Sequence, residues 1–130
     1  MKITLVPLGL ALLLAAGPVR SDSGPDILQI FDAFVLSSAA ASKCGRPDEA
    51  TLRKFLANFE LVWMRAAEAL EARYPDRTRD QIGRAMKAKA DHLSNRVFEV
   101  VEADGCGDAK IRDLLERFKM HVLWEPGKGS

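Results

Sequence analysis

Histidine, cysteine and tyrosine are scarce in this 130-residue chain, which has two histidines, two cysteines and one tyrosine. His92 and His121 lie far apart, and neither has a second histidine or a cysteine one helical turn away. A zinc site needs three or four ligands of these kinds, so the sequence predicts none. The one possible metal ligand a helical turn after either histidine is Glu125, four positions after His121. We expect both histidines to lie at the surface or at a helix end.

The chain also lacks the short motifs of the commonest enzymes and cofactor proteins. It has no Gly-x-Ser-x-Gly for a nucleophilic serine and no Cys-x-x-Cys-His for covalent haem. The glycines around Cys106 are not followed by the lysine and hydroxyl of a phosphate-binding loop. Haem held by His121 and one of Met64, Met86 or Met120 is an alternative, although methionines at core spacing usually fill space. The sequence thus predicts no catalytic residue, no metal and no cofactor.

An excess of charge of one sign is absent too. The chain has 19 basic and 18 acidic residues, which gives a formal net charge of +1. Proteins that bind nucleic acids or anionic membranes through bulk charge usually have a large basic excess or a one-sided basic patch. Basic residues do gather between Arg77 and Arg96, but Asp80 and Asp91 are interleaved with them. We interpret this region as a mixed-charge face in contact with water, so neither nucleic acid nor membrane is an expected partner.

What the sequence does have begins with an apolar run from Ile3 to Ala16, preceded by one lysine and followed by Arg20. A basic residue, an apolar stretch of this length and small residues at its end are typical of a secretory signal peptide. The run is shorter than the roughly 20 residues of a membrane-spanning helix. We therefore expect residues 1–21 to be a cleaved signal peptide, 22–124 to be one helical domain and 125–130 to be a flexible tail. The alternative is a buried N-terminal helix of the fold.

From Pro25 onward, apolar residues recur three and four positions apart, and glycine or proline marks the interruptions. That spacing is typical of amphipathic helices. It predicts four helices, over about residues 25–43, 47–73, 78–103 and 108–122. The expected fold class is therefore all-α, with the second and third helices longer than the first and fourth.

The ends of these helices carry residues that commonly cap helices. Asp22 or Ser23 can cap the first helix, and Asp108 can cap the fourth. Thr78, with a glutamine three residues later, has the spacing of a capping box. Gly45 is expected in the left-handed conformation where the first helix ends.

The two cysteines, Cys44 and Cys106, fall in the first and third connections between helices. Short connections make consecutive helices antiparallel, so these two connections lie at the same end of an up-down-up-down four-helix bundle. In an oxidising compartment, two such thiols form a disulfide. The bond spans 62 positions, for which the chain-entropy model gives about 4 kcal/mol of stabilisation. An intermolecular disulfide or a free redox thiol is the alternative.

At the opposite end of the bundle, the connection Tyr74–Thr78 joins the two long helices. We call this region the hairpin tip, and we expect it to project past the shorter helices. Apolar and aromatic residues flanked by arginines are typical of protein-binding surfaces. The candidate partner-binding residues are Leu70, Arg73, Tyr74, Arg77, Arg79, Ile82 and Met86. The alternatives are a solvated tip whose apolar residues pack on one another and a dimer that covers it.

Together these features predict a non-enzymatic protein that is exported to the bacterial periplasm or secreted and binds a protein partner. The sequence does not identify that partner, and it allows a monomer or a homodimer. The alternative function is a carrier of a small molecule or cofactor in the bundle interior, near Trp63, Met64 and Met86. An enzyme would need polar groups that converge in a pocket, and no motif indicates any.

Overall fold

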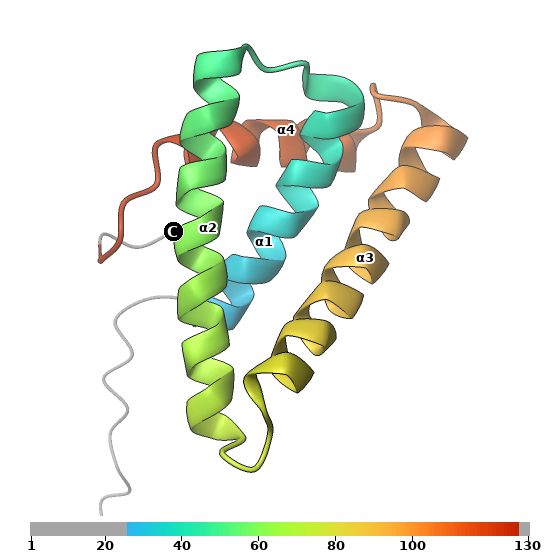
Figure 1. Ribbon diagram of the computed structural model, residues 1–130. Helices are drawn as coiled ribbons and strands as arrows, with labels where there is room; N and C mark the ends of the chain where they lie inside the picture. The colour runs from blue at the N-terminus through green and yellow to red at the C-terminus, as the bar shows by residue number, and fades with distance from the viewer. Residues whose placement is uncertain (1–25, 128–130) are drawn as a thin grey trace, which may run out of the picture.

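The computed structural model describes residues 26–127, which form four packed α-helices (Figure 1). They are α1 (Ile27–Ala40), α2 (Glu49–Arg73), α3 (Arg79–Asp104) and α4 (Ala109–Val122), and α1 continues into a π-helical segment, η1 (Ala41–Gly45). No strand occurs within this range, so the predicted all-α class is confirmed there. Helices α2 and α3 have 25 and 26 residues, whereas α1 and α4 have 14 each, as expected. The predicted signal peptide lies outside the described residues.

An aspartate or threonine side chain caps the start of each helix. Asp26 caps α1 by accepting a hydrogen bond from a backbone N–H of the first turn at 3.2 Å. It replaces the expected caps Asp22 and Ser23, which lie outside the described residues. Asp48 caps α2 and Asp108 caps α4 in the same way. Thr78 forms the predicted capping box at the start of α3, with hydrogen bonds of 2.9 and 3.1 Å.

Helix α1 is the central helix and contacts each of the other three. Phe31, Phe34 and Val35 are among its buried residues. By length and composition alone, the segment Ile27–Gly45 is also long and apolar enough to cross a membrane, with a mean hydropathy of 1.3. The core helix of a bundle passes the same test, and in this fold the segment packs against three other helices.

Helices α1, α2 and α3 run in alternating directions, but α4 lies across α1 and α2 (Figure 1). Near its start, α4 packs Ile111 in one cluster with Val97 of α3, and near its end Phe118 packs against Phe55 of α2. Four helices are therefore packed together, but the predicted up-down-up-down topology is not confirmed. The crossing lets the apolar face of α4 pack against α1 and α2 as well as α3.

The predicted disulfide between Cys44 and Cys106 is present, with the two Cα atoms 5.6 Å apart. It joins η1 to the connection between α3 and α4. The two connections that hold the cysteines thus lie at the same end of the molecule, as the sequence predicted. This confirmed bond fixes the end of the protein opposite the hairpin tip.

The prediction of a left-handed Gly45 is wrong, because Arg46 holds that conformation, with φ of 42°. Gly45 has a different role. A Cβ atom at this position would lie 3.2 Å from the Ala41 Cβ atom and 3.3 Å from the Leu115 Cδ2 atom. The missing side chain therefore allows α4 to approach η1 closely.

The hydrophobic core has an aromatic part and an aliphatic part. In the aromatic part, the ring centroids of Phe34 and Phe55 are 5.4 Å apart, and those of Phe55 and Phe118 are 4.4 Å apart. The aliphatic part lies toward the disulfide and includes Ala40 and Val97. The core thus fastens α4 to α1 and α2, and the exposed connection Tyr74–Thr78 lies outside it.

Candidate functional site

The hairpin tip is a short turn whose backbone is held by hydrogen bonds. Helix α2 is capped at Tyr74, whose N–H donates to the Leu70 carbonyl at 2.8 Å. Pro75 follows, and a proline disfavours helical backbone at the residue before it. The Arg77 N–H donates to the Tyr74 carbonyl at 3.0 Å, and the Thr78 capping box then begins α3. These bonds position Tyr74 at the end of the molecule with 45% of its surface exposed.

The arginines of the tip differ in their partners. Arg73 lies 3.8 Å from the carboxylate of Asp26, and Arg79 lies 3.2 Å from that of Glu71. The Arg77 guanidinium lies over the tyrosine ring, 5.9 Å from its centroid, and pairs with no carboxylate within residues 26–127. Arg77 is therefore the tip arginine whose charge is available to a partner.

The structure separates the seven candidate tip residues into an exposed and a buried group. The exposed members are Arg73, Tyr74, Arg77 and Arg79. Leu70 is half-buried and packs against the core. Ile82 and Met86 are only 4% and 3% exposed, because helical spacing turns this face of α3 toward the core. The expectation that Ile82 and Met86 belong to an exposed surface is thus corrected, and the candidate surface is smaller than predicted.

A buried polar pair includes His121, which the sequence predicts to lie at the surface or at a helix end; it lies in the last turn of α4 but is buried. His121 is 8% exposed, and its ring stacks on Phe34 with centroids 4.1 Å apart. Its Nδ1 atom lies 2.7 Å from the Ser37 hydroxyl oxygen. The hydroxyl donates its one hydrogen to the Phe34 carbonyl at 3.2 Å, so its oxygen accepts from a protonated Nδ1. Burial, and secondarily the charge of Arg117, lowers the pKa of His121 to about 4. The imidazole is therefore neutral at pH 7.

A serine and a histidine within hydrogen-bonding distance could in principle form a nucleophile and its base. Ser37, however, is completely buried, so a substrate has no access to its hydroxyl. The pair instead satisfies two polar groups inside the core, where an unpaired group would be costly. The sequence did contain a cue, since His121 stands three positions after the buried Phe118, on the apolar face of α4.

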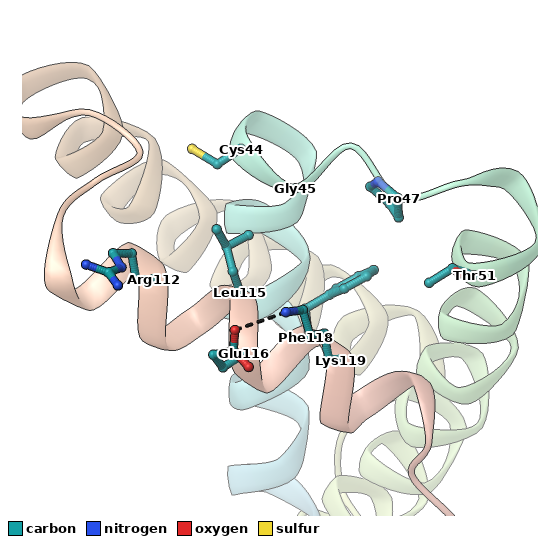
Figure 2. A pocket seen from close by; sticks show the side chains of 9 residues that line it. All are labelled: Cys44, Gly45, Pro47, Thr51, Arg112, Leu115, Glu116, Phe118 and Lys119. Carbon is teal, nitrogen blue, oxygen red and sulfur yellow. Dashed lines mark hydrogen bonds and ion pairs between the residues drawn. The ribbon is translucent and has the colours of Figure 1, made fainter.

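A hollow of about 430 Å³ lies beside the disulfide, where η1, the start of α2 and α4 meet (Figure 2). Leu115 points toward Gly45 in this view, and Phe118 forms part of the wall. At the rim, Glu116 and Lys119 pair with each other at 3.0 Å. Arg112 also lines the hollow and pairs with no carboxylate within residues 26–127. The hollow therefore offers mainly apolar contact and one unpaired cation, which is not a converging set of polar groups.

The residues suggested for an interior ligand do not converge on one cavity. Met64 is 51% exposed on the outside of α2, whereas Met86 is buried and lines a hollow of about 180 Å³. Trp63 packs edge-on against Phe31, with centroids 5.1 Å apart. In the part of the chain that the structure describes, no group of three or more His, Cys, Asp or Glu side chains is placed to hold a metal ion.

No protein-family model matches the chain, and no curated protein and no solved structure matches it either. Its function therefore has to be inferred from its own geometry. The features available are the exposed hairpin tip, the disulfide at the other end and the hollows between the helices.

Proposed function

We propose that the protein is exported and acts outside the cytoplasm as a non-enzymatic binding protein that contacts a protein partner through the hairpin tip. The observation that carries this proposal is the exposed pair of Tyr74 and Arg77. Tyrosine and arginine are two of the residue types that contribute most to binding energy at protein interfaces. Here they are adjacent and exposed at one end of the molecule.

The rigidity of the turn supports the choice of this surface. Tyr74 and Arg77 are joined by a backbone hydrogen bond of 3.0 Å, and the capping box fixes the residues that follow. A preorganised surface loses less conformational entropy on binding than a flexible one. Leu56, Met64, Met120 and Leu123 are more exposed than Tyr74, but exposed apolar side chains are normal on protein surfaces. The tip differs because it combines an aromatic ring with an arginine that has no carboxylate partner within residues 26–127.

Two observations favour export. Disulfides form and persist in oxidising compartments, and the protein has one between Cys44 and Cys106. The apolar run Ile3–Ala16 has the length and flanking residues of a signal peptide. A small domain that works outside the cytoplasm also gains stability from such a bond.

Site-specific photocrosslinking tests the proposal. A photoreactive amino acid is placed at Tyr74 in cells that naturally produce the protein, and a matched control carries it at Lys54, which is exposed near the other end of α2. We expect one crosslinked protein from position 74 that is absent from position 54. Mass spectrometry then identifies it, and the purified partner is used for affinity measurements.

In those measurements, Tyr74→Ala and Arg77→Ala should each weaken binding by about 30-fold, the effect of an interface residue worth about 2 kcal/mol. Lys54→Ala should change the affinity less than about twofold, because most interface and surface residues contribute little. Equal crosslinking from both positions, or tip variants that bind like the wild type, would exclude the hairpin tip as the contact surface.

A further inference from the structure

A larger hollow lies between α1, α3 and α4, away from the hairpin tip, and has a volume of about 650 Å³. We call it the crossing groove. Its apolar lining includes Leu36, Leu93, Val97, Val100, Ile111 and Leu114. Val97 and Ile111 are almost completely buried and belong to the aliphatic part of the core, while Leu36, Leu93 and Leu114 are half-buried. The groove therefore has an apolar floor that is part of the rigid core.

Charged side chains also line the groove, and most of them are basic. They are Arg96 of α3 and Lys110, Asp113 and Arg117 of α4. Asp113 pairs with Arg117 at 2.9 Å. Arg96 and Lys110 have no carboxylate partner within residues 26–127. The groove thus combines an apolar floor with two exposed cations whose charge is not neutralised.

The groove is a consequence of how α4 crosses the fold. The disulfide fixes the connection between α3 and α4, and Ile111 fastens the start of α4 to α3 and α1. The groove also contains Ala33 of α1 and Ala109 of α4, whose small side chains leave space. Its walls are thus held by core packing and by a covalent bond, so it is formed before any ligand arrives.

We propose that the crossing groove binds a single-chain anionic amphiphile, namely a fatty acid. Its acyl chain lies on the apolar floor, and its carboxylate is held by Arg96 and Lys110. The volume lies within the range of about 300–1,000 Å³ found for ligand sites. Volume and charge together favour an acyl chain with a negative headgroup.

Binding of sodium laurate to the purified, disulfide-bonded protein tests this proposal. Calorimetric titrations are run below the concentration at which laurate forms micelles. We expect saturable binding of one laurate per chain. Binding should tighten about tenfold from decanoate to laurate, because two more methylene groups leave water. Methyl laurate and a cationic detergent with the same chain should bind at least tenfold more weakly.

Variants separate the roles of charge and volume. Arg96→Gln combined with Lys110→Gln removes both unpaired cations and should weaken laurate binding at least tenfold. The matched control, Lys54→Gln combined with Arg65→Gln, makes the same change in net charge at exposed positions of α2 outside the groove and should bind within twofold of the wild type. Ala33→Leu fills part of the groove and should weaken binding without lowering the melting temperature.

The proposal fails if laurate shows no saturable binding. It also fails if the uncharged or cationic compound binds as well as laurate, or if the charge variant and its control lose affinity equally. Sedimentation velocity provides the remaining test. The groove would be a subunit interface if the protein forms a stable dimer that laurate does not dissociate and that Leu114→Ser converts to a monomer. Partner binding at the hairpin tip involves other residues, so each proposal can fail without the other.

Discussion

Protonation of His121 is the perturbation that tests the packing of α4 most sharply. Burial, followed by the charge of Arg117, lowers its pKa from 6.5 to about 4. A histidine whose pKa is lower in the folded state binds its proton more tightly when the chain is unfolded. The contribution of His121 to stability is therefore fully present above pH 6.5, and it is lost as the pH falls from 6.5 toward 4.

The size of this effect follows from the two pKa values. A pKa lowered from 6.5 to about 4 corresponds to a loss of about 3 kcal/mol once the pH is below 4. Between pH 7 and pH 5, the expected loss is about 2 kcal/mol. Domains of this size have a total stability on the order of 5–10 kcal/mol, so the loss is large enough to measure.

Urea unfolding at pH 7 and pH 5 measures the loss, with tryptophan fluorescence as the signal. The wild type should lose about 2 kcal/mol between these pH values, whereas His121→Phe keeps an aromatic ring against Phe34 and should lose much less. The matched control is His92→Gln, since His92 is exposed on α3, and it should lose as much as the wild type. Asp48 does not interfere. Its pKa is lowered from 3.8 by its hydrogen bonds to Thr51, so its contribution is lost only at more acidic pH.

Two results would refute this reasoning. One is an equal loss of stability in the wild type and in His121→Phe. The other is an NMR titration in which His121 has a pKa near 6.5, the value of an exposed ring. Either result would mean that the His121 ring is accessible to water, and the packing of the end of α4 on α1 would then be wrong.

Three further predictions concern stability and are measured by urea or thermal unfolding. Replacing both Cys44 and Cys106 with serine should lower the free energy of unfolding by about 4 kcal/mol, because the disulfide spans 62 positions. Reducing the disulfide of the wild-type protein should have the same effect. An unchanged free energy of unfolding would show that the bond does not constrain the chain. Ile82→Ala should destabilise the protein by about 3 kcal/mol and Tyr74→Ala by less than about 0.5 kcal/mol, so equal losses would contradict the burial of Ile82. Arg46→Gly should stabilise the protein by up to about 1 kcal/mol, because glycine adopts the φ of 42° found at Arg46 without strain. A loss of stability in this variant would argue against the left-handed conformation of residue 46.

The helices and the disulfide could be predicted because they depend on local patterns. Capping residues such as Thr78 and Asp108 act on backbone groups only two or three positions away. Apolar spacing identifies each helix from its own sequence. The disulfide needed only the placement of Cys44 and Cys106 in connections at one end of the fold.

The course of α4 could not be predicted in the same way. The short connection around Gly105 allows α4 either to run beside α3 or to cross α1. Contacts between Phe118 and Phe55 decide between the two, and these residues are far apart in the sequence. The role of His121 likewise depends on Ser37, 84 positions away. Such contacts appear only once the helices are packed.

The candidate surface was only partly predictable for a different reason. Tyr74 and Arg77 lie in a turn, where proline and a capping residue already indicate exposure. Ile82 and Met86 follow the tip in the sequence, and this position alone favours assigning them to the same surface. Their spacing of four places them on one face of α3, and that face is buried against the core.

Native mass spectrometry of unreduced protein recovered from outside the cytoplasm tests the central claim most directly, since it reports export, the disulfide and partner binding together. We predict a chain without its N-terminal apolar segment, two hydrogens lighter than its reduced form, in a complex with one partner that Tyr74→Ala no longer retains. A chain that keeps the segment and has two free thiols, or a complex that Tyr74→Ala leaves intact, would contradict the account of an exported protein that binds through its hairpin tip.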